Sequence, residues 1–119
     1  MKVLIVEDNL QMQALLTTLV GRLSAETTTC GDGDEALAAY ATYHPDWVLM
    51  DLQMARIGGL EATRQIRAAF PAARIVVVTQ YDDAHYRAAA YAAGACGYVL
   101  KDNLVEVLQI LRPETDGGG

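Results

Sequence analysis

The residues Trp47-Val48-Leu49-Met50-Asp51-Leu52-Gln53-Met54 begin as an apolar run, present one carboxylate and then lead into a glycine-containing loop at 55–59. Four consecutive apolar residues without alternation indicate a strand that is buried on both faces, as in a parallel sheet. A carboxylate directly after such a strand lies at the carboxyl edge of the sheet, where open α/β sheets bind their ligands. We therefore expect the rest of the chain to be arranged around Asp51.

Four further segments have the composition of strands. Three of them are largely apolar runs, whereas residues 26–29 are β-prone but polar, which is typical of a strand near a sheet edge. Together with the opening run, the predicted strands are 3–6, 26–29, 47–50, 74–78 and 97–100.

Apolar residues between these strands recur at three- and four-residue spacing, which predicts amphipathic helices. Asn9 is a suitable N-cap for the first helix. The expected inner face of that helix consists of Met12, Leu15, Leu16, Leu19, Val20 and Leu23. The expected inner face of the second helix consists of Ala36, Leu37, Tyr40 and Ala41.

Three more helices are predicted at about 60–70, 83–93 and 104–111, with Gly94 at the C-terminal end of the fourth. Strands that alternate with helices form an α/β domain, because each crossover is long enough for a right-handed βαβ unit. We predict a doubly wound parallel sheet of five strands with five helices, in one domain over residues 1–112. Residues 113–119 have the composition of a flexible tail or the start of a linker.

The overall composition excludes several classes of protein. Of 119 residues, 52% are hydrophobic and the net charge is -6, which suits a compact domain and disfavours direct nucleic-acid binding. No apolar run is long enough to span a membrane, and Glu7 comes too early for a signal peptide. The two cysteines, Cys30 and Cys96, are too few for a disulfide framework, which is typical of a cytoplasmic protein.

Polar residues of reactive types follow four of the predicted strands. They are Glu7 and Asp8, Asp51, Thr79, and Lys101. Because the carboxyl ends of parallel strands share one edge of a doubly wound sheet, these side chains should converge there. Three carboxylates in a partly desolvated cleft repel one another more strongly than one lysine can offset, so a divalent cation is expected.

Mg²⁺ suits such a site, because it binds one or two carboxylates and keeps coordination positions for water and phosphate. Asp51 is then a candidate nucleophile toward phosphorus. Lys101 would stabilise charge on the phosphoryl oxygens, and Thr79 would donate a hydrogen bond to one of them.

These residues carry a resemblance to a known family. The matching pieces are Val-Glu-Asp at 6–8, Met-Asp-Leu at 50–52, Gly-Leu-Glu-Ala at 59–62, Thr79, Ala-Gly-Ala at 93–95 and Gly-Tyr-Val-Leu-Lys-Asp at 97–102. From residue 2 to about residue 112 the chain resembles the receiver domain of two-component response regulators. It is most similar to receivers of the LuxR-type helix-turn-helix (NarL-like) subfamily, and the resemblance implies the flavodoxin-like strand order 2-1-3-4-5.

The resemblance implies a phosphoacceptor switch rather than a metabolic enzyme. Asp51 would receive a phosphoryl group from a histidine kinase and lose it slowly by autodephosphorylation. Glu7, Asp8, Asp51 and the backbone carbonyl of Gln53 would bind Mg²⁺, and Lys101 would pair with the phosphoryl group.

The output side of the switch is also implied by the family. Thr79 would move toward the phosphoryl group, and the ring of Tyr98 would turn inward with it. The controlled output would be transcription, through a DNA-binding domain outside this sequence, and a homodimer is a further expected partner. Val105 and Ile110, off the inner face of the last helix, are candidates for a partner surface.

Several positions depart from the common family pattern and leave an alternative open. Ala55 replaces a frequent proline, Gln80 is bulkier than the usual small residue, and Asp102 stands where many receivers have proline. The alternative is therefore a degenerate receiver that acts as a phosphorylation-independent interaction module.

Two other classes of protein are disfavoured by residues at single sites. A mononucleotide binder needs a Ser/Thr/Gly-rich loop after the first strand, where this chain has Glu7 and Asp8. A phosphohydrolase of the haloacid dehalogenase type needs a second aspartate at the position of Gln53. In the implied strand order, Cys30 and Cys96 flank opposite edge strands, so no disulfide should join them.

Overall fold

The computed structural model describes residues 1–54 and 56–112. The strands are β1 (Lys2–Val6), β2 (Glu26–Cys30), β3 (Trp47–Met50), β4 (Ile75–Thr79) and β5 (Gly97–Leu100). The helices are α1 (Leu10–Gly21), α2 (Gly33–Tyr43), α3 (Gly59–Ala69), α4 (Ala84–Ala93) and α5 (Val105–Leu111). The predicted alternation of strands and helices is confirmed, and the expected tail at 113–119 lies outside the described residues.

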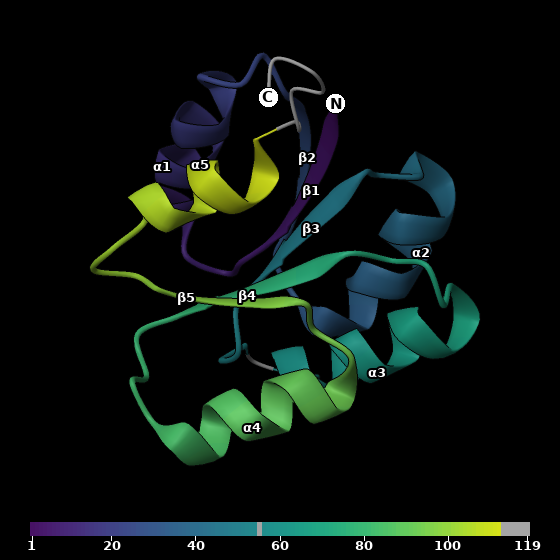
Figure 1. Ribbon diagram of the computed structural model, residues 1–119. Helices are drawn as coiled ribbons and strands as arrows, with labels where there is room; N and C mark the ends of the chain where they lie inside the picture. The colour runs from purple at the N-terminus through teal and green to yellow at the C-terminus, as the bar shows by residue number, and fades with distance from the viewer. Residues whose placement is uncertain (55, 113–119) are drawn as a thin grey trace, which may run out of the picture.

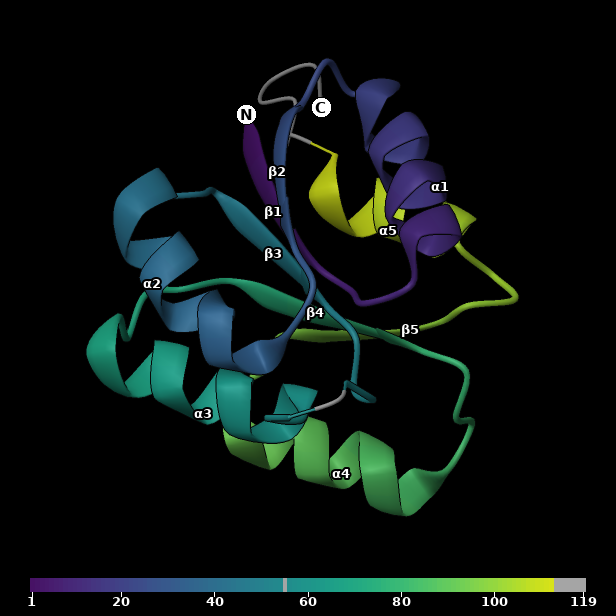
Figure 2. The ribbon, with the colours of Figure 1, turned by 180° about the vertical axis from the view of Figure 1, so that it is seen from behind.

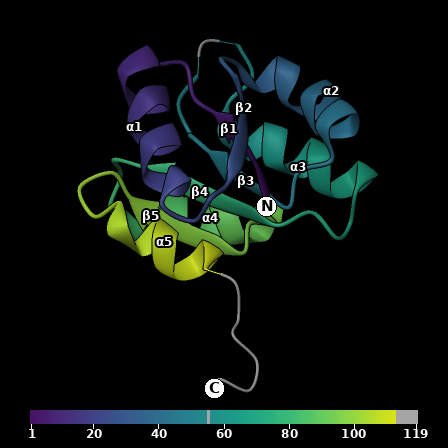
Figure 3. The same ribbon diagram turned by 90° about the horizontal axis from the view of Figure 1, so that it is seen from above.

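The five strands form one parallel sheet in the order β2-β1-β3-β4-β5. Helices α1 and α5 cover one face, and α2, α3 and α4 cover the other (Figures 1 and 2). Viewed from above, α1 lies on one flank of β1 and β3, with α2 and α3 on the opposite flank (Figure 3). The predicted doubly wound sheet and its flavodoxin-like order are therefore confirmed.

The central strands are buried on both faces, as their uninterrupted apolar runs predict. Alternate residues face opposite sides: Val3 and Ile5 of β1 pack with α1 and α5, whereas Leu4 and Val6 pack with α2 and α3. By contrast, every residue of β2 is at least partly exposed. The polar Thr-rich segment therefore forms an edge strand, as expected.

Two predicted helix faces are wider than the real ones. Leu15 is 49% exposed while its neighbour Leu16 is buried, and Ala41 is exposed while Ala36 is buried. Adjacent residues in a helix point about 100° apart and residues five positions apart point about 140° apart, so only one residue of each pair can face the sheet squarely. The prediction was wrong for Leu15 and Ala41 because periodicity alone does not show which edge of an apolar stripe meets the sheet.

The ends of the helices show both agreement and correction. Asn9 caps α1 through a hydrogen bond that its side chain accepts from the N–H of Met12, and Gly94 caps α4 with a positive φ of 113°. Val105 is 52% exposed, as expected of a residue off the inner face. Ile110 instead packs partly against the core beneath α1 and α5, so it was wrongly placed off that face.

The two cysteines lie at opposite edges of the sheet, at the end of β2 and just before β5, and both are free thiols. The expected absence of a disulfide between Cys30 and Cys96 is therefore confirmed. No helix among the described residues is long and apolar enough to cross a membrane.

Candidate functional site: an acidic pocket at the carboxyl edge of the sheet

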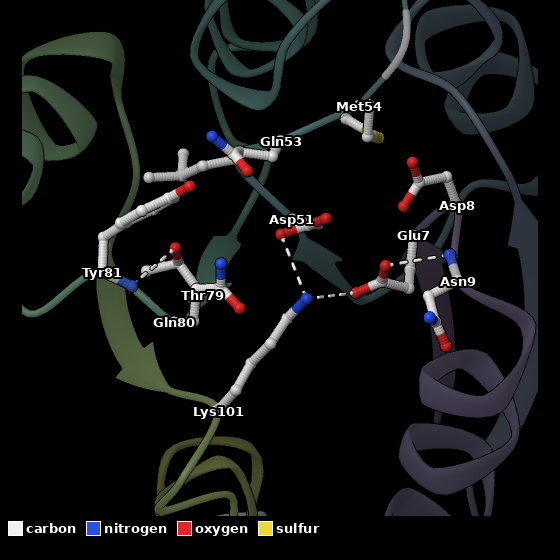
Figure 4. A pocket seen from close by; sticks show the side chains of 11 residues that line it. Glu7, Asp8, Asn9, Asp51, Gln53, Met54, Thr79, Gln80, Tyr81 and Lys101 are labelled. Atoms are coloured by element: carbon white, nitrogen blue, oxygen red, sulfur yellow. Dashed lines mark hydrogen bonds and ion pairs between the residues drawn. The ribbon is translucent and has the colours of Figure 1, made fainter.

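The polar residues that follow β1, β3, β4 and β5 meet in one pocket at the carboxyl edge of the sheet (Figure 4). The pocket is lined by Glu7, Asp8, Asn9, Asp51, Leu52, Gln53, Met54, Thr79, Gln80, Tyr81 and Lys101. Every predicted site residue except Tyr98 is among them. The convergence follows from the parallel arrangement, since each strand ends at the same edge.

Three carboxylates form the acidic part of the pocket. One carboxylate oxygen from each of Glu7, Asp8 and Asp51 lies within 4.8 Å of the others. Glu7 is 1% exposed and Asp51 is 6% exposed, whereas Asp8 is open to solvent. The carboxylates of Glu7 and Asp51 are therefore largely removed from water. Their repulsion is stronger there than it would be in solvent, because the surroundings screen charge less.

Lys101 brings the positive charge into this cluster. Its Nζ lies between Glu7 and Asp51, 2.9 Å from Oε1 of Glu7 and 3.4 Å from Oδ1 of Asp51 (Figure 4). The ammonium group of Lys101 is thus the partner of the buried Oε1 of Glu7 among the described residues. One ammonium group thus faces three carboxylates, and the cluster keeps an excess of negative charge.

The pKa values of these groups reflect that excess. Burial raises the pKa of Asp51 above its usual range, although Lys101 and a backbone hydrogen bond from Gln53 oppose the shift and Asp8 adds to it. Burial likewise raises the pKa of Glu7, against the effects of Lys101 and the Asn9 backbone. For Lys101 burial acts to lower the pKa, but the two carboxylates outweigh it and raise the pKa overall.

The start of α1 holds Glu7 in place. The Asn9 N–H donates to Oε2 of Glu7 at 3.0 Å, and the side-chain amide of Gln13 donates to the Glu7 backbone carbonyl at 2.5 Å. From the sequence Asn9 was predicted only as a helix cap, and no role was predicted for Gln13. No local pattern marks Gln13, because its role arises only when α1 folds back over the end of β1.

A second group of contacts links the pocket to β5 and α4. The Thr79 hydroxyl oxygen accepts the Tyr81 N–H at 3.2 Å, and the Tyr98 hydroxyl donates to the Tyr81 carbonyl at 2.7 Å. Tyr98 is 5% exposed, and its ring is covered by the Arg87 guanidinium at 4.5 Å. Tyr98 therefore lies outside the pocket but is joined to Thr79 through the backbone of a single residue.

The loop after Asp51 is packed closely against the strand that precedes it. Gly59 donates its N–H to the Leu52 carbonyl at 3.0 Å, and a Cβ at Gly59 would overlap the Asp51 backbone carbonyl oxygen. Glycine is therefore required at this close approach. The loop carries Gln53 and Met54 along the pocket wall, whereas Ala55 lies outside the described residues.

A match to a known protein family identifies the kind of domain that carries this pocket. Residues 3–112 match the response regulator receiver domain. The chain belongs to this family. It is thus a signalling domain of two-component systems and not a member of a metabolic enzyme family, as predicted.

Curated relatives of this receiver domain are transcriptional regulators. It is 44% identical over 78 residues to the uncharacterized transcriptional regulatory protein YxjL of Bacillus subtilis, covering 66% of this chain and 36% of that protein. It is 33% identical over 114 residues to the response regulator GacA of Pseudomonas syringae, covering 93% of this chain and 53% of that protein. The chain therefore spans about a third to a half of the length of these relatives.

Solved structures of similar proteins share its fold, and one of them is a LuxR-family regulator. A LuxR-family two-component response regulator from Aurantimonas matches with a TM-score of 0.85 and 32% identity, covering 92% of this chain and 83% of that chain. The response regulator TrrA of Thermotoga maritima, in complex with Mg²⁺–BeF, matches with a TM-score of 0.84 and 31% identity, covering 93% and 96%. The predicted similarity to LuxR-type receivers is therefore confirmed.

Proposed function

We propose that Asp51 is the phosphoacceptor of this receiver domain and that a cytoplasmic histidine kinase supplies the phosphoryl group. The observation that carries the proposal is the pairing of a largely buried Asp51 with Lys101 at 3.4 Å, inside a pocket that also contains Thr79. This arrangement offers a nucleophilic oxygen, a cation for the phosphoryl oxygens and a hydroxyl donor.

The transfer needs little chemistry beyond positioning. A carboxylate oxygen of Asp51 forms the new bond to phosphorus while the phosphorus–nitrogen bond of a phosphohistidine breaks, and the leaving imidazole takes a proton from solvent. Lys101 would neutralise charge on the transferred oxygens, releasing part of its interaction with Glu7. The product is an acyl phosphate on Asp51.

The residues fit a hard divalent cation such as Mg²⁺. Glu7, Asp8 and Asp51 each offer a carboxylate oxygen within 4.8 Å of the others, and Lys101 is the only cation that pairs with this cluster in the part of the chain that the structure describes. These three side chains, with the backbone carbonyl of Gln53, would hold the ion. When bound, Mg²⁺ would neutralise carboxylate and phosphoryl charge.

The contacts around Tyr81 support a switch role for Thr79 and Tyr98. If the Thr79 side chain moves toward a phosphoryl oxygen, the hydrogen bond that its hydroxyl accepts from the Tyr81 N–H is stretched, and the Tyr98 hydroxyl is bonded to the same Tyr81. The phosphoryl group would thereby bias a two-state equilibrium at β5 and α4. The output is proposed to be transcription, through a DNA-binding domain beyond this chain, with homodimerisation as a further mode.

Intact-mass spectrometry after incubation with acetyl phosphate and Mg²⁺ tests the proposal. We expect wild type to gain the mass of one phosphoryl group, and Asp51→Asn or wild type in EDTA to gain none. Asp46→Asn is the matched control and should behave as wild type, because Asp46 lies at the amino ends of the strands, away from the pocket. Wild type that neither binds Mg²⁺ nor gains mass under any condition would favour the phosphorylation-independent interaction module.

A further inference from the structure

The turn between β2 and α2 contacts the loop that follows Asp51. The carboxylate of Asp32 accepts three backbone N–H groups: Asp34 to Oδ1 at 3.2 Å, Ile57 to Oδ1 at 3.2 Å and Arg56 to Oδ2 at 3.1 Å. Only the first of these bonds is a cap of α2. The other two cross 24 and 25 positions of sequence to reach the loop between β3 and α3.

Two further contacts join the same segments. Arg56 Nη1 lies 3.1 Å from Oδ2 of Asp34, and the backbone of Gly33 approaches the Ile57 carbonyl so closely that a Cβ there would overlap it. The side chain of Arg56 is 77% exposed, so the ion pair adds little by itself. The close approach of Gly33, however, brings the Asp32 carboxylate within reach of the loop amides.

Met54 and Ile57 of the loop pack against the core beneath α2 and α3, but the loop has few other polar contacts among the described residues. At its far end Gly59 is tied to Leu52, and at its near end it leaves β3 at Asp51. Between these ends, Gln53 and Met54 line the acidic pocket. Hydrogen bonds to an ionised carboxylate are stronger than neutral ones, so Asp32 is the main polar restraint on the middle of the loop.

We propose that Asp32 is a positioning residue for the phosphorylation site, and that its hydrogen bonds to the Arg56 and Ile57 amides restrain the loop so that Gln53 stays at the pocket wall. The inference rests on the proposed function of that pocket. Preorganised ligands bind more tightly because less freedom is lost on binding, and supporting contacts commonly alter metal affinity by about 10- to 100-fold.

Substitutions at Asp32 can separate capping from positioning. Serine is a good N-cap and can accept the Asp34 N–H, but its side chain is too short to reach the loop amides. Asp32→Ser should therefore keep α2 and lose both cross-loop bonds. Asp32→Asn retains one oxygen and should be intermediate. Asp34→Ala removes the ion pair to Arg56 without touching the backbone bonds, and serves as the control.

Hydrogen–deuterium exchange of residues 53–58 tests the restraint without any ligand. In Asp32→Ser we expect exchange at the Arg56 and Ile57 amides to rise on the order of tenfold, with α2 unchanged. Calorimetric titration with Mg²⁺ should show a dissociation constant about tenfold larger than that of wild type in Asp32→Ser, and a smaller increase in Asp32→Asn. Asp34→Ala should match wild type in both measurements.

The outcomes separate the two proposals. Unchanged loop exchange in Asp32→Ser would overturn the positioning role, whatever the domain does with phosphate. Faster exchange with unchanged Mg²⁺ affinity would also overturn it, because Asp32 would then support only the loop. If wild type itself bound no Mg²⁺ and accepted no phosphoryl group, the proposed function would fail, while the exchange data would still report on the cross-loop bonds.

Discussion

The two edges of the sheet use similar charged residues to opposite effect. At the amino edge, Asp46 accepts the Lys2 backbone N–H at 2.7 Å and its carbonyl accepts Arg74 Nε at 3.1 Å, while the Arg74 guanidinium lies 4.2 Å from the centroid of the Trp47 ring. These polar groups satisfy one another. At the carboxyl edge, three carboxylates share one lysine, the only cation within ion-pair distance of Glu7 and Asp51 among the described residues.

The contrast indicates where function can be expected in this fold. Groups that already satisfy one another gain little from a ligand, whereas the crowded acids at the carboxyl edge gain from any cation or phosphoryl group that relieves them. Perturbed pKa values cluster at functional sites for the same reason. The polar residues at the strand ends, and not the core between them, therefore determine which edge of the sheet is reactive and which has only a structural role.

Removing one cation at each edge, Lys101 or Arg74, should give the largest difference in the rate of phosphorylation. Lys101→Ala should slow phosphorylation of Asp51 by about 100-fold or more, because a positioned cation for the phosphoryl oxygens is lost. Arg74→Ala should stay within about twofold of wild type, since Arg74 contacts only the amino edge. The rate of mass gain from acetyl phosphate measures both. Equal losses in the two variants would show that the effect comes from general destabilisation.

Mg²⁺ should stabilise the folded domain through the carboxyl edge alone. Saturating Mg²⁺ at about 100 times its dissociation constant should raise the free energy of unfolding of wild type by about 2.7 kcal/mol. Asp8→Asn should lose most of this gain, and Asp46→Asn should retain it. Urea denaturation with Mg²⁺ and with EDTA provides the measurement, and a gain that persists in Asp8→Asn would contradict the assigned ligands.

Without metal, Asp51 should cost stability at neutral pH. Its pKa is raised in the folded state, mainly by burial, so the folded domain binds this proton more readily than the unfolded chain does. Ionisation therefore disfavours folding, and Asp51→Asn should add roughly 1 kcal/mol to the free energy of unfolding at pH 7 in EDTA. The gain should shrink as the pH falls through the raised pKa. A gain that grew toward acid pH would have the wrong sign.

The smallest effect is expected from the stacked pair at the amino edge. A double-mutant cycle of Trp47→Leu and Arg74→Ala should give a coupling energy of about 0.5–1 kcal/mol, typical of a cation over an exposed ring. Phosphorylation should be unchanged in all three variants. Thermal unfolding of the variants measures the coupling energy. A coupling energy of zero would show that the stacking of Arg74 on Trp47 does not contribute to stability.

Much of the fold and the site could be predicted from the residues because the signals are local. An uninterrupted apolar run such as Val3–Val6 shows a doubly buried strand, and a polar run such as Glu26–Thr29 shows an edge strand. The residue after each strand is also visible in the chain. Once the strands are known to be parallel, the meeting of Asp51, Thr79 and Lys101 follows from topology.

The tertiary structure decided what depends on contacts between distant segments. It placed Leu16 and not Leu15 against the sheet, divided Lys101 between Glu7 and Asp51, and brought Asp32 to the loop after Asp51. None of these has a signature in neighbouring residues. Helix rotation, the sharing of one charge and a cross-loop hydrogen bond are set by packing to within a fraction of an ångström, whereas sequence periodicity specifies only which residues can face inward.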